Sequence, residues 1–139
     1  MKLLVIDGQG GGVGRMLVER LRLRLPEQPV LALGTNALAT AAMLKAGAAA
    51  GATGENAICF QCRDADVIAG PIGIVLANGL MGELTPAVAA AVGESRAMKV
   101  LVPVGKCRVR VAGAELPLEE AVAAAVEQIA RLAETGTGA

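Results

Sequence analysis

The strongest constraint on the fold is a run of glycines between an apolar segment and a helical pattern near the amino end. Residues 2–6 are Lys-Leu-Leu-Val-Ile, and five of the seven residues 8–14 are glycine. A glycine-rich turn between a strand and a helix lets the backbone approach an anion, and the first N–H groups of the helix point at it. We therefore predict a strand over 2–6, a helix over 12–25 and a phosphate site between them.

Apolar runs and helical patterns keep alternating along the chain, which favours parallel strands joined by helices. Further helix starts are predicted at Thr35 or Asn36, at Thr85 and at Pro117, where a capping side chain or a proline precedes apolar repeats. We predict an α/β fold, a Rossmann-like three-layer sandwich with a mostly parallel sheet in the strand order 2-1-3-4 plus an edge strand. The strands counted in this order are 2–6, 30–33, 66–69 and 98–102, the edge strand is 107–111, and the Ala/Gly stretch 48–52 has room for another short strand.

Length and composition indicate one domain over residues 1–134, followed by a frayed tail over 135–139. Of the 139 residues 54% are hydrophobic, which is more than a small monomer readily hides, so we expect a homo-oligomer. The 13 basic and 13 acidic residues do not indicate a nucleic-acid partner. No apolar stretch reaches the ~18 residues of a membrane span. The 3 cysteines, without a secretory signal, indicate reduced thiols in a cytoplasm.

Missing residue types exclude most catalytic sets. The chain has no His, Tyr or Trp, and Ser95 is its single serine. A Ser-His-Asp triad, a Cys-His pair and a His-ligated metal are therefore excluded. We interpret the chain as a binding protein, with regulation as one role, and leave open whether it catalyses a reaction.

The predicted strand order reverses between the strands 2–6 and 66–69, and ligands of open α/β sheets bind at such a reversal. The loops 8–12 and 70–73 meet there, and Pro103-Val104-Gly105 follows on the same edge. We expect the glycines of the first loop to cradle phosphate, Arg15 to add charge, Thr35 and Asn36 to lie near a ribose, and 70–73 to form the opposite wall. The predicted site residues are Gly8, Gln9, Gly10, Gly11, Gly12, Val13, Gly14, Arg15, Thr35, Asn36, Gly70, Pro71, Ile72 and Gly73.

The spacing Gly8-x-x-x-Gly12-x-Gly14 resembles the loop of short-chain dehydrogenases and reductases. This resemblance covers about the first 25 residues, and it implies a nucleotide or dinucleotide such as NAD(P) held by its phosphates. The Tyr-x-x-x-Lys of that family is absent because the chain has no Tyr. The acidic residue that usually follows the second strand is replaced by Thr35 and Asn36.

Nearly the whole chain also resembles a small bacterial family of unknown function. The resemblance is carried by the opening Val-Ile-Asp-Gly-Gln-Gly-Gly-Gly (5–12), by Gly-Ala-Thr-Gly-Glu-Asn-Ala (51–57) and by Gly-Pro-Ile-Gly-Ile (70–74). It implies a compact Rossmann-like domain and gives no information about an activity.

Two alternatives remain beside phosphate binding. Asp7 ends the first strand, and we favour the interpretation that it accepts N–H bonds from its own loop. The alternative is a Mg²⁺-assisted enzyme that acts on a phosphorylated metabolite with Asp7 and Glu55. A third hypothesis is a thiol metal or iron–sulfur site at Cys59, Cys62 and Cys107. No metal is assigned to these residues.

Overall fold

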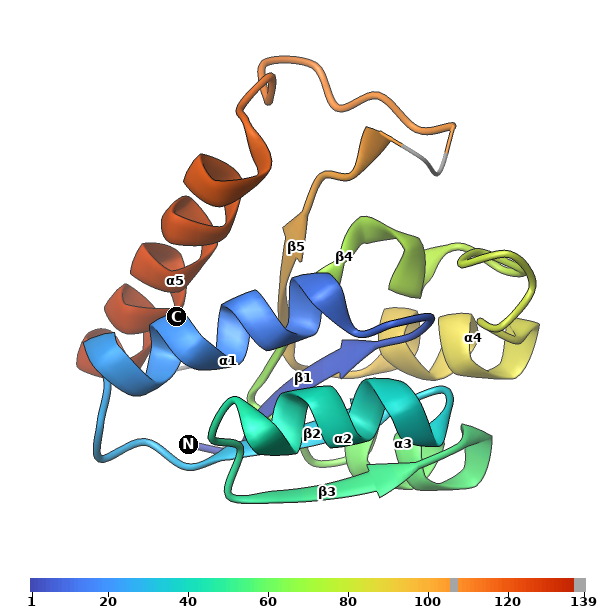
Figure 1. Ribbon diagram of the computed structural model, residues 1–139, viewed down its shortest axis with the longest axis horizontal. Coiled ribbons are helices and arrows are strands. Elements are labelled where there is room, and N and C mark those ends of the chain that lie inside the picture. The colour runs from blue at the N-terminus through green and yellow to red at the C-terminus, as the bar shows by residue number, and fades with distance from the viewer. Residues whose placement is uncertain (106–107, 137–139) are drawn as a thin grey trace.

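The computed structural model describes residues 1–105 and 108–136 and contains a five-stranded parallel sheet with helices on both faces (Figure 1). The strand order β3-β2-β1-β4-β5 contains the predicted order and confirms the Rossmann-like α/β sandwich. The strands are β1 (Leu3–Asp7), β2 (Val30–Gly34), β3 (Ala50–Thr53), β4 (Val67–Pro71) and β5 (Met98–Val102). The helices are α1 (Gly12–Arg24), α2 (Ala37–Lys45), α3 (Glu55–Cys62), the 3-10 turn η1 (Ile72–Val75), α4 (Pro86–Glu94) and α5 (Leu118–Thr135).

Strand β1 is the centre of the sheet, and all five of its residues are buried. It pairs with β2 on one side and with β4 on the other, so that Leu3 lies opposite both Val30 and Val67. Leu3 and Val5 enter one apolar cluster, and Leu4 and Ile6 enter the other. A strand covered on both faces needs an unbroken apolar run, which explains why residues 3–6 carry no polar side chain.

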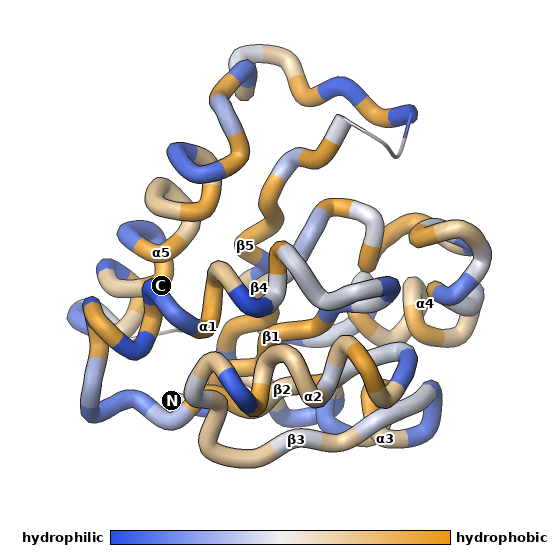
Figure 2. Tube along the Cα trace, viewed as in Figure 1, coloured by the Kyte–Doolittle hydropathy of each residue, from blue (hydrophilic) through white to orange (hydrophobic). Residues whose placement is uncertain are grey.

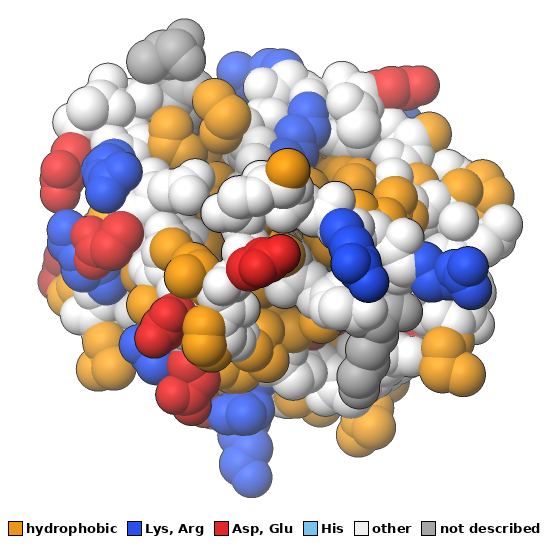
Figure 3. Space-filling model, turned by 90° about the horizontal axis from the view of Figure 1, so that it is seen from above, with side chains coloured by type: hydrophobic (Ala, Val, Ile, Leu, Met, Phe, Trp, Pro, Cys, Tyr) orange, Lys and Arg blue, Asp and Glu red, His pale blue; other side chains and the backbone are white. Residues whose placement is uncertain are grey.

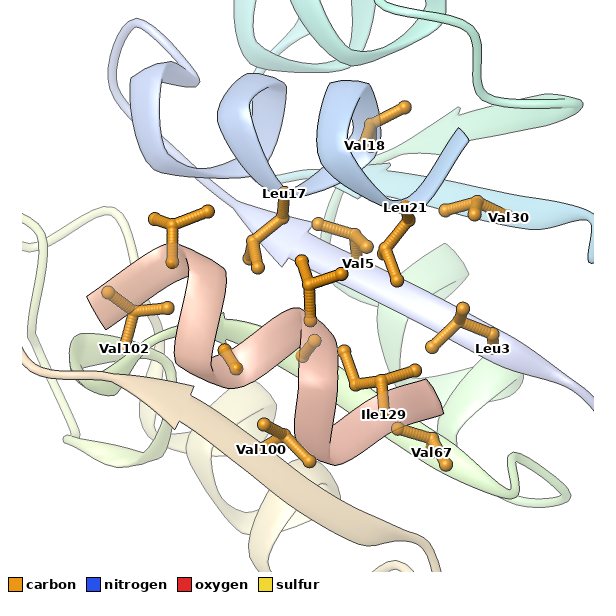
Figure 4. Packing of buried hydrophobic residues seen from close by; sticks show 14 of the residues in the cluster. Leu3, Val5, Leu17, Val18, Leu21, Val30, Val67, Val100, Val102 and Ile129 are labelled. Carbon is orange, nitrogen blue, oxygen red and sulfur yellow. The ribbon is translucent and has the colours of Figure 1, made fainter. Parts of the chain in front are cut away.

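Helices α1, α2 and α5 cover one face of the sheet, and α3 and α4 cover the other. Figure 4 shows Leu17 and Leu21 of α1 pointing toward Val5, with Ile129 of α5 on the same face. The hydropathy trace in Figure 2 places the apolar segments in the central strands and the hydrophilic ones mainly in the outer turns. The packed face of α1 follows the predicted spacing of four residues at Leu17 and Leu21.

The predicted edge strand over 107–111 is wrong for its described part. Residues 108–111 form no strand, and Arg108 has a left-handed φ of 58°, which breaks an extended run. Cys107 lies outside the described residues. The fifth strand is instead β3, which lies in the Ala/Gly stretch beside β2 and forms one edge of the sheet, opposite β5.

Side-chain caps mark the starts of two helices, α2 and α4. Asn36 caps α2 by accepting the Ala39 N–H at 2.8 Å, and Thr85 caps α4 ahead of Pro86, as predicted. Pro117 is the residue before α5. Helix α5 ends at Thr135. Of the tail predicted over 135–139, residues 137–139 lie outside the described part of the chain.

Candidate functional site

A cavity of about 580 Å³ opens at the carboxyl ends of β1 and β4, where the chain crosses to opposite sides of β1. It brings together the three glycine-bearing loops that the strand order predicted to share an edge. The lining residues are Asp7, Gly8, Gln9, Gly10, Gly11, Gly12, Val13, Arg15, Met16, Pro71, Gly73, Leu80, Met81, Val104 and Leu118.

Three glycines of the loop are required by the packing around them. A Cβ on Gly8 would lie 2.5 Å from the hydroxyl oxygen of Thr35, and a Cβ on Gly14 would lie 2.6 Å from the sulfur of Met43. Gly11 has a left-handed φ of +73°, and its Cβ would lie 2.9 Å from the Cα of Ala39. These positions let α1 start close to α2, whatever the cavity holds.

Gly10 and Gly12 differ from these three glycines because the fold does not require glycine there. Neither has a positive φ, and a Cβ at either position would meet no atom within 4 Å. Both residues line the cavity. Their N–H groups have no acceptor within the described residues. The bare backbone at these two positions is therefore open to a ligand.

The hydrogen bonds of Asp7 confirm the prediction that this side chain accepts N–H groups from its own loop. It is 4% exposed, and its two oxygens accept the Gly8 N–H at 2.8 Å and the Gly14 N–H at 2.7 Å. Burial raises the pKa of Asp7, while the N–H groups of Gly14, Gly8 and Val13 oppose the rise and the charge of Glu83 adds to it. The carboxylate thus occupies part of the amino end of α1, the position predicted for a phosphate.

Glu83 is a site residue that the sequence did not reveal, because its place before Thr85-Pro86 only suggests the entry to a helix. One of its oxygens accepts three bonds, from the Gln9 N–H at 2.9 Å, the Thr35 hydroxyl at 2.8 Å and the Asn36 amide at 2.7 Å. The Gln9 N–H bond is the main reason why the pKa of Glu83 is lowered, and the Thr35 and Asn36 bonds add to it against partial burial. Glu83 therefore ties the β1–α1 loop to the start of α2.

The segment before Glu83 has unusual backbone geometry. Asn78, Leu80 and Met81 have φ values of 63°, 55° and 57°, in the left-handed region that non-glycine residues rarely adopt. Leu80 packs where Gly8 and Gly73 lack side chains, since a Cβ on these glycines would lie 2.9 Å and 3.0 Å from its methyl groups. Strained residues of this kind gather at binding sites, and here Leu80 and Met81 form one wall of the cavity.

Five predicted site residues do not line the cavity. Thr35 and Asn36 are occupied by Glu83, and Asn36 also donates to the Gln9 carbonyl at 3.0 Å. Gly70 serves the close approach of β4 to β1, because a Cβ there would lie 2.2 Å from the Ile6 carbonyl oxygen. The residues outside the lining are Gly14, Thr35, Asn36, Gly70 and Ile72.

The carboxylates of the magnesium hypothesis do not share a site. Asp7 lines the cavity, whereas Glu55 lies outside its lining, at the start of α3, and accepts the hydroxyl of Thr85. Both oxygens of Asp7 already accept N–H groups. Over residues 1–105 and 108–136, no group of three or more His, Cys, Asp or Glu side chains is arranged to hold a metal ion.

Two of the three cysteines lie on α3. Cys62 is 1% exposed, and burial raises its pKa to about 11. The thiol of Cys59 is partly buried and donates to the Ala87 carbonyl at 3.7 Å. Cys107 lies outside the described residues. A buried thiol with a raised pKa is a poor nucleophile at neutral pH.

The surface viewed from above carries charges of both signs, with hydrophobic side chains between them (Figure 3). Positive and negative groups alternate on this face and do not gather into a patch of one sign. In the described part of the chain, no helix combines the length and the apolar character needed to cross a membrane.

Comparisons with known proteins identify the family of this chain. No curated protein and no solved structure matches it. One family profile does match, and it spans residues 2–134, nearly the full length. The chain therefore belongs to the family described as "Domain of unknown function (DUF3842)".

Proposed function

We propose that this chain binds a small phosphate-bearing molecule in the cavity, with nucleotides and dinucleotides such as NAD(P) as the first candidates. The observation that carries the proposal is the bare backbone at Gly10 and Gly12. Packing does not require glycine at these positions, and both residues line the cavity. Their free N–H groups lie at the amino end of α1, where a negative charge is favoured. Arg15, in the first turns of α1, lines the same cavity.

A thermal-shift panel tests the proposal with inorganic phosphate, NAD, NADP, ATP, GTP and sugar phosphates. A ligand at 100 times its dissociation constant adds about 2.7 kcal/mol. For a chain of this size, that raises the melting temperature by roughly 10 °C.

The variant Gly12→Val fills the open space in front of the loop and should remove the shift. The matched control is Gly93→Val, because Gly93 is also helical, exposed and free of atoms within 4 Å of its Cβ, but lies outside the cavity. A shift that survives in Gly12→Val, or no shift with any phosphate compound, would refute the proposal.

We also propose that the chain acts as a homo-oligomer. Several large apolar side chains are exposed, among them Leu23 at 83%, Leu38 at 70% and Phe60 at 57%. Such side chains favour association with a second copy. Light scattering coupled to size-exclusion chromatography tests this directly, and a mass equal to that of one chain at all concentrations would refute it.

We propose that the protein acts in a reducing compartment such as the cytoplasm. The two described cysteines are free thiols, which is the usual state in such a compartment. We propose regulation as one role of this binding, because the chain lacks the His and Tyr side chains on which many catalytic sets depend.

A further inference from the structure

The two sides of the cavity differ in chemistry. Its charged or polar side chains, within the described residues, all come from the segment 7–15, at Asp7, Gln9 and Arg15. Among the described residues, the side chains of the remaining wall are apolar or absent. The apolar lining residues of that wall are Met16, Pro71, Leu80, Met81, Val104 and Leu118. A ligand that is anchored at the glycine loop therefore meets hydrocarbon in the other direction.

Glu83 occupies the polar groups at the end of β2, next to the glycine loop. Its carboxylate uses the Gln9 N–H, the Thr35 hydroxyl and the Asn36 amide, with donor–acceptor distances of 2.9, 2.8 and 2.7 Å. The other hydrogen-bonding groups of Asn36 are occupied by the Gln9 carbonyl and the Ala39 N–H. The side-chain donors of Thr35 and Asn36 at the end of β2 are thus already used within the protein.

The cavity extends instead toward β4, β5 and α5. Pro71 ends β4, Val104 follows β5, and Leu118 is the first residue of α5. Met16 of α1 also lines the cavity and packs against the apolar cluster to which β5 and α5 contribute. Methionine adapts to apolar groups of different shape, and each methylene buried against such a wall is worth roughly fourfold in affinity.

We infer that the ligand is a phosphate ester with one apolar body, which lies against Val104, Leu118 and Met16, and that it is not a dinucleotide. This inference rests on the proposed function, because the glycine loop must hold the phosphate. It narrows the candidates of that proposal, because it excludes dinucleotides, and it adds the direction in which the ligand extends and the chemical class of its body.

Isothermal titration calorimetry with four probes tests the inference: inorganic phosphate, hexyl phosphate, AMP and NAD. We expect hexyl phosphate to bind at least 30-fold more tightly than inorganic phosphate, and NAD to bind no more tightly than AMP. If NAD binds tenfold or more tightly than hexyl phosphate, the inference is overturned and the proposed function stands. If none of the four probes binds, the proposed function fails and the inference fails with it.

A pair of leucine variants places the apolar body. Leu118 lines the cavity and is 40% exposed, whereas Leu116 is 53% exposed and lies outside the lining. Leu118→Ala should weaken hexyl phosphate about tenfold and leave inorganic phosphate unchanged, because only the apolar contact is lost. Leu116→Ala should leave both probes unchanged. Equal effects of the two variants on hexyl phosphate would overturn the placement.

Discussion

Replacing Gly11 and Gly12 separately by alanine tests how the loop is built, because the structure assigns opposite roles to these neighbours. Gly11 has a φ of +73°, and a left-handed alanine costs about 1–2 kcal/mol. Its Cβ would also lie 2.9 Å from the Cα of Ala39, and crowding of this kind costs about 1–3 kcal/mol. Gly11→Ala should therefore lower the free energy of unfolding by about 2–5 kcal/mol.

Gly12→Ala should have the opposite sign. Gly12 is the first residue of α1, and a Cβ there meets no atom within 4 Å. Alanine restricts the unfolded chain and favours the helix, so the variant should be neutral or more stable by up to about 1 kcal/mol.

Urea denaturation followed by circular dichroism measures both variants. With an m-value of roughly 1–3 kcal/mol/M, the midpoints should differ by about 1–2 M or more. Equal midpoints, or a Gly12→Ala variant as unstable as Gly11→Ala, would refute the division into structural and open glycines. Both variants should keep the helix content of the parent in the absence of urea, which shows that the comparison concerns one fold.

Three further predictions concern the carboxylates and the core. Asp7→Asn should cost about 1–3 kcal/mol in urea denaturation, because an amide nitrogen cannot accept the second N–H group; no loss would mean that the paired acceptance is unimportant. The lowered pKa of Glu83 adds stability above the unfolded value near 4.5, and this is lost as pH falls through the folded pKa. Glu83→Gln should remove that part of the acid slope and cost about 1 kcal/mol or less at pH 7, since the group is partly exposed; an unchanged slope would contradict it. Ile129→Ala should cost about 2–5 kcal/mol because the side chain is fully buried, whereas Leu23→Ala, at 83% exposure, should stay within about 0.5 kcal/mol.

Local patterns in the sequence were sufficient to predict the order of four of the five strands, β2-β1-β4-β5. The apolar run of β1 and the four-residue spacing of Leu17 and Leu21 reflect burial directly, and a strand that is apolar on both faces is typical of a parallel sheet. The alternating segment 107–111 was misleading for its described part. Val109 and Val111 alternate with arginines and offer little apolar surface to hold an edge strand. The left-handed φ of Arg108 also interrupts the extended run.

The candidate site was less predictable, because its geometry depends on residues distant in sequence. Whether a loop glycine is structural is decided by Ala39 and Met43 of α2, which the spacing of the loop does not reveal. The partner of Gln9, Thr35 and Asn36 is Glu83, which follows Gln9 by 74 residues. No periodicity predicts a carboxylate at that place.

The division of the loop N–H groups limits how the cavity can hold an anion. Gly8 and Gly14 donate to Asp7, Gln9 donates to Glu83, and Gly11 donates to the Gly8 carbonyl at 2.9 Å. The Val13 N–H also acts on the Asp7 carboxylate. Gly10 and Gly12 remain among the described loop residues, and hydrogen bonds to a charged group contribute about 1.5–3 kcal/mol each. Two such bonds supply about 3–6 kcal/mol before the cost of association, so the dissociation constant of a bare phosphate should be no lower than about 40 μM. Micromolar affinity then needs energy from the rest of the molecule, and the unoccupied surface that can supply it is the apolar wall toward β5 and α5. A ligand that binds tightly here therefore needs both a phosphate for the two amides and an apolar group for the opposite wall.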